Sequence, residues 1–119
     1  MSLPRSTMPV RAISIRQPYV ELILRRKKQR EYRSRPTNIR ERVWLYAALR
    51  PAERSEWRKI RKHPGDLPTG VVVGSVEIVD CQWDGRVGSY AYTLKAPKRL
   101  AKNKKPNGQP TPCFWRPRF

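Results

Sequence analysis

The chain has 119 residues, about one domain, and its 27 lysines and arginines against 9 acidic residues leave a formal net charge of +18. That charge favours a polyanionic partner, nucleic acid first, because phosphates relieve self-repulsion and release counterions; basic side chains that only solvate the surface are the alternative. Two cysteines and one histidine exclude a Cys₄ or Cys₂His₂ zinc site and a two-imidazole ribonuclease centre within one chain, and no apolar run approaches the roughly 20 residues that span a bilayer.

The chain starts with a leader, a strand and a helix. Residues 1–9 contain two prolines and no periodic pattern, so we expect a flexible leader without a secretory signal, followed by one domain over residues 10–119. Arg11–Ile15 predicts a short strand. Pro18–Arg26 predicts a short helix, because proline is tolerated in a first turn and the apolar residues after it recur at helical spacing.

The next elements are a polar strand, an apolar strand and a second helix. Gln29–Ser34 is a possible polar strand, on which Glu31 and Arg33 would share one face. Val43–Ala47 is rich in aromatic and β-favouring residues, which predicts a core strand. Pro51–Lys62 predicts a helix, because its acidic residues come early and its basic residues late, as the helix dipole favours.

The C-terminal half completes a small sheet. Gly70–Asp80 predicts the central strand, and Gly74 inside it indicates a bulge or a close approach of another backbone. Tyr90–Leu94 predicts a further strand, and the basic, proline-containing Lys95–Pro112 predicts a long loop. Residues 114–115 are too apolar for a free tail and predict a closing strand or a plug. We therefore expect an α+β fold, a small mixed β-barrel of five to six strands with two short helices.

Two segments, Ser14–Ile23 and Lys28–Ser34, resemble the ASCH domain family, named for activating signal cointegrator homology. That family opens with a strand, an Arg-Gln-Pro-aromatic sequence and a short helix, and then shows a Gly-x-Lys-x-x-Glu-x-Arg signature. Lys28, Glu31 and Arg33 match the last three positions of the signature. The resemblance implies a PUA-like β-barrel whose cleft beside the signature meets nucleic acid, in members that interact with RNA or act enzymatically on RNA or modified nucleosides.

The resemblance covers roughly Val10 to Trp115 and departs from the signature at one position. Arg26 stands where the signature has glycine. Glycine takes a left-handed backbone conformation at a helix end freely, whereas arginine takes it only at a cost. Either the turn is built differently here, or the mouth of the site is more basic.

Lys28, Glu31 and Arg33 are the central candidate site, with two cations and a carboxylate around one concavity. Arg33 would hold a phosphate or a carboxylate in a bidentate manner, and Glu31 would accept from a base amino group or orient Lys28. The alternative is an ion pair between Glu31 and Arg33 that supports the barrel mouth, with Lys28 simply exposed.

Two basic clusters could flank a single groove or form separate solvated surfaces. The first lies at the end of the first helix, over residues 25–30, and the second lies in the late loop and consists of Lys95, Lys98, Arg99, Lys102, Lys104 and Lys105. Gln17 could contact nucleic acid or cap the helix, and Tyr19, Trp83 and Trp115 could stack on bases or pack in the core. The candidate nucleic-acid-binding residues are Arg16, Gln17, Arg25, Arg26, Lys27, Lys28, Glu31, Arg33, Lys102, Lys104, Lys105 and Trp115.

The leading interpretation is an intracellular, cytoplasmic and monomeric module that binds RNA, with DNA as a possible partner and no membrane, metal or cofactor involved. An RNA-directed enzyme is the first alternative, either a ribonuclease or an amidohydrolase acting on an acylated nucleoside, with Lys28 and Glu31 as catalytic residues. An interaction domain for an acidic protein is the second alternative.

Overall fold

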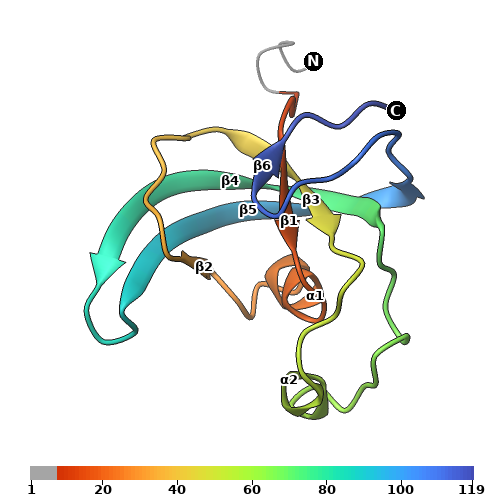
Figure 1. Ribbon diagram of the computed structural model, residues 1–119, viewed down its shortest axis with the longest axis horizontal. Helices are drawn as coiled ribbons and strands as arrows, with labels where there is room; N and C mark the ends of the chain where they lie inside the picture. Colours follow the sequence, from red (N-terminus) through yellow and green to blue (C-terminus); the bar gives the residue numbers. More distant parts are fainter. Residues whose placement is uncertain (1–7) are drawn as a thin grey trace.

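A computed structural model describes residues 8–119, so most of the leader expected over residues 1–9 lies outside the described residues. Within them, six strands form one mixed sheet in the order β2-β5-β4-β3-β1-β6 (Figure 1). The elements are β1 (Ala12–Ile15), α1 (Tyr19–Leu24), β2 (Arg30–Arg33), β3 (Arg42–Ala47), α2 (Arg54–Arg58), β4 (Val71–Asp84), β5 (Ser89–Lys104) and β6 (Phe114–Trp115).

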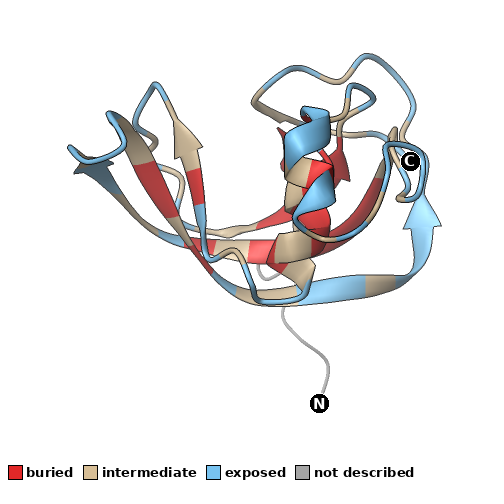
Figure 2. Ribbon diagram, turned by 90° about the horizontal axis from the view of Figure 1, so that it is seen from below, coloured by how far each residue is buried: buried red, intermediate tan, exposed pale blue. Residues whose placement is uncertain are grey.

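The centre of the sheet is buried on both faces, which is why β1 and β3 read as nearly continuous apolar runs. The two strands run parallel, with Ile13 opposite Leu45. Alternate residues point to opposite faces, so Ile13 and Leu45 join the main core beside α1, while Trp44 and Tyr46 form a second, smaller cluster. Figure 2 shows the buried middle of the sheet and the more exposed ends of its long strands.

The expected loop over Lys95–Pro112 was wrong in its first part, because β5 continues as a strand to Lys104. β2 pairs only with Tyr90–Thr93, so the rest of β5 hydrogen-bonds to β4 on one side and has an open edge on the other. Lysines and a proline are the residues that an open edge tolerates. Because this half of the strand has no buried face, its sequence lacks the alternation of apolar and polar residues that predicts a strand.

The expected barrel was also wrong in one respect, because the sheet does not close. β2 and β6 are its two edges, and they do not pair with each other. Strands of four and two residues are too short to complete a ladder. Instead, Arg33 from β2 reaches across and donates to the carbonyl oxygens of Ser14, at 2.6 Å, and Pro112, at 3.0 Å. The α+β class, the strand number and the two short helices were predicted correctly.

Both predicted helices are present but shorter than expected. α1 stops at Leu24, and Arg26 then adopts a left-handed backbone with φ of 63°. This is the conformation expected at the signature's glycine position. α2 is anchored by Trp57, which is 1% exposed and donates to the carbonyl oxygen of Ala52. Over residues 8–119, neither helix is long and apolar enough to cross a membrane.

Gly74 lies where the sequence predicts a bulge or a close approach, and both are present. The register of β4 shifts against β5 next to Gly74, and the register of β3 against β4 shifts there as well. A Cβ atom at this position would clash with the carbonyl oxygen of Lys98 and with the side chain of Leu24. The glycine lets β5 and α1 pack closely against β4.

Candidate functional site

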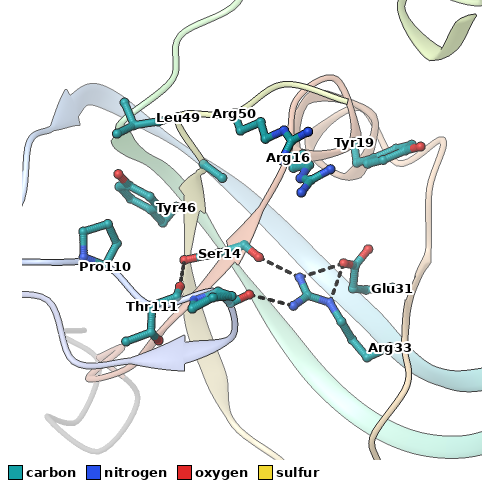
Figure 3. Close-up of a pocket in the computed structure, with 12 residues that line it drawn as sticks. Ser14, Arg16, Tyr19, Glu31, Arg33, Tyr46, Leu49, Arg50, Pro110 and Thr111 are labelled. Carbon is teal, nitrogen blue, oxygen red and sulfur yellow. Dashed lines mark hydrogen bonds and ion pairs between the residues drawn. The ribbon is translucent and has the colours of Figure 1, made fainter. Parts of the chain in front are cut away.

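A cleft of about 480 Å³ opens at the unpaired edges of the sheet, where β2 faces β1 and the segment before β6 (Figure 3). Five parts of the chain contribute to it: the end of β1, the start of α1, β2, the end of β3 and residues 110–112. Its lining residues are Ser14, Arg16, Tyr19, Glu31, Arg33, Tyr46, Ala48, Leu49, Arg50, Pro110, Thr111 and Pro112.

Glu31 and Arg33 form one wall of the cleft, on the same face of β2 as the sequence predicts. Glu31 is only 7% exposed, and its Oε2 accepts from Arg33 Nε at 2.9 Å. The other guanidinium nitrogens of Arg33 donate to the carbonyl oxygens of Ser14 and Pro112. Because each nitrogen already has a protein acceptor, this geometry favours the support role considered for the pair over direct capture of a phosphate by Arg33.

Lys28 does not share the concavity with Glu31 and Arg33, so that part of the expected arrangement is corrected. Its Nζ lies 3.6 Å from Glu31 Oε1, and Lys28 is not among the residues that line the cleft. It also lies 5.2 Å from the ring centre of Tyr19 and 5.4 Å from that of Tyr32, within the range of cation–π attraction. Lys28 is therefore partly buried against Glu31 and the two tyrosine rings, and it is neither free in the cleft nor simply exposed.

Arg16 and Arg50 supply the cations at the cleft rim. Both residues are exposed, and within residues 8–119 neither guanidinium has a hydrogen-bond acceptor or an ion-pair partner. Figure 3 shows them next to each other, across the cleft from Arg33. Arg16 was a predicted site residue. Arg50 was missed, because it follows a core strand directly before Pro51 and no local pattern distinguishes it from other surface arginines.

Two tyrosines give the cleft aromatic surface. Burial raises the pKa of Tyr19, and the nearby carboxylates of Glu56 and Glu31 raise it further. Burial also raises the pKa of Tyr46. Both phenols therefore stay neutral at physiological pH and can donate a hydrogen bond. Tyr46, like Ser14 and Thr111, was missed by sequence reasoning, since it lies in a strand that reads as pure core.

Trp115 supports the cleft from beneath. Its indole Nε1 donates to Ser14 Oγ at 2.9 Å, and its ring packs edge-on against Tyr46 with centroids 5.1 Å apart. The hydroxyl of Ser14 in turn donates to the carbonyl oxygen of Thr111 at 2.6 Å. Trp115, which was expected to stack on bases, thus holds the cleft residues Ser14 and Tyr46 in position. Trp83, another candidate, is 58% exposed and lines a separate hollow.

Gln17 and Arg25 both have hydrogen-bond partners within the protein. Gln17 is 1% exposed; its Oε1 accepts from the backbone N–H of Glu21 in the first turn of α1, and its Nε2 donates to the carbonyl oxygen of Pro68. These contacts support the interpretation of Gln17 as a helix cap. The expectation that Gln17 contacts nucleic acid directly is corrected, because its side chain is buried. Arg25 donates to Glu21 at 2.7 Å, and Arg99 donates to both carboxylate oxygens of Glu21 at 2.9 Å.

Glu21 therefore joins the two basic clusters, one at the end of α1 and one along β5. Burial alone would raise the pKa of its carboxyl, but the hydrogen bonds and charges of Arg99 and Arg25 outweigh that effect and hold it below the usual range. Three further lysines of the second cluster, Lys102, Lys104 and Lys105, are exposed and do not line the cleft. Lys104 lies over the rings of Trp44 and Phe119.

The cleft combines apolar and aromatic lining with cations at its rim. Such a site fits a flat, partly apolar ligand that carries an anionic group, as a nucleotide does. Within the part of the chain that the structure describes, no three histidine, cysteine, aspartate or glutamate side chains lie together in a way that could hold a metal ion.

Comparison with known proteins agrees with the resemblance in the sequence. The model of the ASCH domain family matches residues 13–109. Activating signal cointegrator 1 from Homo sapiens and its counterpart from Mus musculus are each 35% identical to the chain over 80 residues. Each alignment covers 58% of this chain but 14% of the relative, so the similarity is confined to a small part of those larger proteins.

Proposed function

This chain belongs to the ASCH domain family, and we propose that it is an RNA-binding module whose cleft holds one unpaired nucleotide. The observation that carries the proposal is the pair of exposed guanidinium groups of Arg16 and Arg50, which meet at the cleft rim without an acceptor among the described residues. Arginine pairs with phosphate oxygens through two parallel hydrogen bonds, so two such groups at one rim suit a single phosphate.

The interior of the cleft suits a base. Tyr19, Tyr46 and Leu49 offer aromatic and apolar surface, on which a base can stack or pack. Among residues 8–119, Glu31 Oε1 has Lys28 as its one ion-pair partner, at 3.6 Å, and it keeps capacity to accept from an amino or imino group of a base. Arg33 acts as a positioning residue, because it fixes the Glu31 carboxylate against β1.

The kind of ligand that fits the cleft favours a single strand, with RNA first. A cleft for one base requires an unstacked nucleotide, and sequence-specific RNA recognition mostly targets unpaired loops and ends. The net charge of +18 supplies attraction to the remaining phosphates without sequence preference. The exposed Lys102, Lys104 and Lys105 are part of this general surface in the proposal.

The test compares the affinities of single-stranded RNA, duplex RNA and single-stranded DNA by fluorescence anisotropy over a salt series. The double variant Arg16→Ala/Arg50→Ala is expected to weaken single-stranded RNA binding about tenfold or more, because charge-assisted hydrogen bonds to phosphate are removed. The double variant Arg54→Ala/Arg58→Ala removes two exposed arginines from α2, outside the cleft lining, and controls for net charge.

Equal losses in both double variants would contradict a specific role for the cleft. Absence of RNA binding at low salt would contradict the proposal and favour an acidic protein partner. The same samples are analysed on a gel for cleaved RNA and by mass spectrometry for altered nucleosides. Product that disappears in Lys28→Ala would instead make the chain an enzyme.

A further inference from the structure

A second hollow, of about 290 Å³, lies between the end of α1 and the middle of β5. We call it the β5 pocket. Its apolar floor includes Val76 and Leu94, and the cationic residues around it are Arg26, Lys28 and Lys95. Among the described residues, no carboxylate lines it. Arg26 and Lys95 are exposed and have no ion-pair partner within the described residues.

The backbone around the β5 pocket is unusual at two points. Arg26 has φ of 63° and Ala96 has φ of 51°, both in the left-handed region that side chains other than glycine rarely adopt. The surrounding structure holds both residues in place. Arg42 Nη2 donates to the carbonyl oxygen of Ala96 at 2.9 Å, and the N–H groups of residues 27 and 28 donate to the carbonyl oxygen of Leu22. Strained backbone of this kind clusters at binding sites.

Arginine at position 26 is costly for the fold, because glycine adopts the same turn without strain. The side chain makes no hydrogen bond or ion pair with the described residues that would repay this cost. The turn brings it to the edge of a pocket that carries two more cations. A cationic side chain in this strained position, at a pocket with other cations, points to an anionic ligand.

The β5 pocket and the cleft each share a lining residue with a third hollow beside α1. Tyr19 lines both the cleft and this hollow, and Lys28 lines both the hollow and the β5 pocket. The hollow has a carboxylate, Glu56, which forms an ion pair with Lys59, and two further cations, Lys27 and Arg30. A strand of nucleic acid that leaves the cleft past Tyr19 would therefore meet a net positive charge along its path.

From this arrangement we propose that the β5 pocket binds a phosphate group, namely a backbone phosphate of the same RNA strand whose nucleotide occupies the cleft. The inference rests on the proposed function, since it extends that site into a path for several nucleotides. A free phosphate ion has the same chemistry and would meet the same three cations, so the test must separate the two sources.

The test compares Arg26→Gly with wild type, using a uridine mononucleotide, a uridine octamer and inorganic phosphate as probes. The glycine variant is expected to bind the mononucleotide like wild type, because that ligand reaches only the cleft. It is expected to bind the octamer about tenfold more weakly, with a salt slope smaller by roughly 0.7, the value for one phosphate contact of a single strand.

Two controls separate binding from folding. Arg26→Gly relieves the left-handed strain, so its urea midpoint is expected to equal or exceed that of wild type. A lower octamer affinity then cannot reflect unfolding. Arg26→Lys keeps the charge and is expected to retain most of the octamer affinity.

Equal octamer affinity in Arg26→Gly and wild type would overturn the proposal. If Arg26→Gly lowers only the affinity for inorganic phosphate, the pocket takes a free ion and the RNA path is likewise overturned. The double variant Arg16→Ala/Arg50→Ala tests the cleft separately. If the cleft does not bind a nucleotide, this variant binds the mononucleotide like wild type, whatever the result for Arg26→Gly.

Discussion

Replacement of Arg33 by alanine tests whether this side chain joins the open edges of the sheet. The Arg33 side chain is 20% exposed, and the side chain of its partner Glu31 is 9% exposed. The variant loses the hydrogen bonds to Glu31 and to the carbonyl oxygens of Ser14 and Pro112. Breaking a buried ion pair costs about 3–5 kcal/mol. Because the hydrogen bond to Pro112 is exposed, we expect a decrease of about 3 kcal/mol in the free energy of unfolding, at the lower end of that range.

Urea unfolding followed by tryptophan fluorescence measures this decrease. With a denaturant slope of about 1.5 kcal/mol/M, the midpoint is expected to fall by about 2 M. Arg33→Lys keeps the charge but not the planar fork, so it is expected to recover only part of the stability. A change below about 0.5 kcal/mol in Arg33→Ala, typical of a surface substitution, would refute the bridging role. If RNA affinity fell at the same time, Arg33 would instead be a ligand-binding residue.

Three further predictions concern other parts of the molecule. Because the pKa of Glu21 is lowered in the folded state, its contribution to stability is present above about pH 4.3 and is lost as the pH falls through the folded pKa; Glu21→Gln is therefore expected to flatten the decline of the urea midpoint below that pH, and an unchanged decline would contradict it. Gly74→Ala is expected to lower the free energy of unfolding by about 1–3 kcal/mol in the same assay, because its methyl group meets the backbone of β5; an unchanged value would show that β5 moves aside. Joint replacement of Lys102, Lys104 and Lys105 by alanine is expected to reduce the salt slope of RNA binding by about one unit for each phosphate that these lysines bind, and an unchanged slope would remove them from the interface.

Local sequence patterns predicted most of the fold where a strand or helix has a buried face. Val43–Ala47 and the Val72–Val76 part of β4 are buried because their apolar and β-branched residues pack on both sides of the sheet. The second half of β5 could not be found in this way. Its lysines and Pro97 lie on an open edge, so this part of the strand forms because it pairs with β4. A local sequence pattern does not reveal that pairing.

The candidate site was predictable where it lies within one strand, and less so where it depends on tertiary contacts. The spacing of Glu31 and Arg33 places them on one face of β2, as expected. Arg50 and Thr111 reach the same cleft only because β1 pairs with both β3 and β6. Lys28 follows the left-handed turn at Arg26 and contacts Glu31 without lining the cleft. Strand periodicity does not encode that turn.

The most direct measurement of the central claim is the mapping of a bound uridine mononucleotide by ¹H–¹⁵N NMR on the full chain. The account predicts that the largest changes in amide shifts, at saturating nucleotide, fall in residues 14–19, 46–50 and 110–112, which line the cleft. Changes confined to the lysine-rich half of β5, or no changes at millimolar nucleotide, would contradict a nucleotide-binding cleft at the open edges of the sheet.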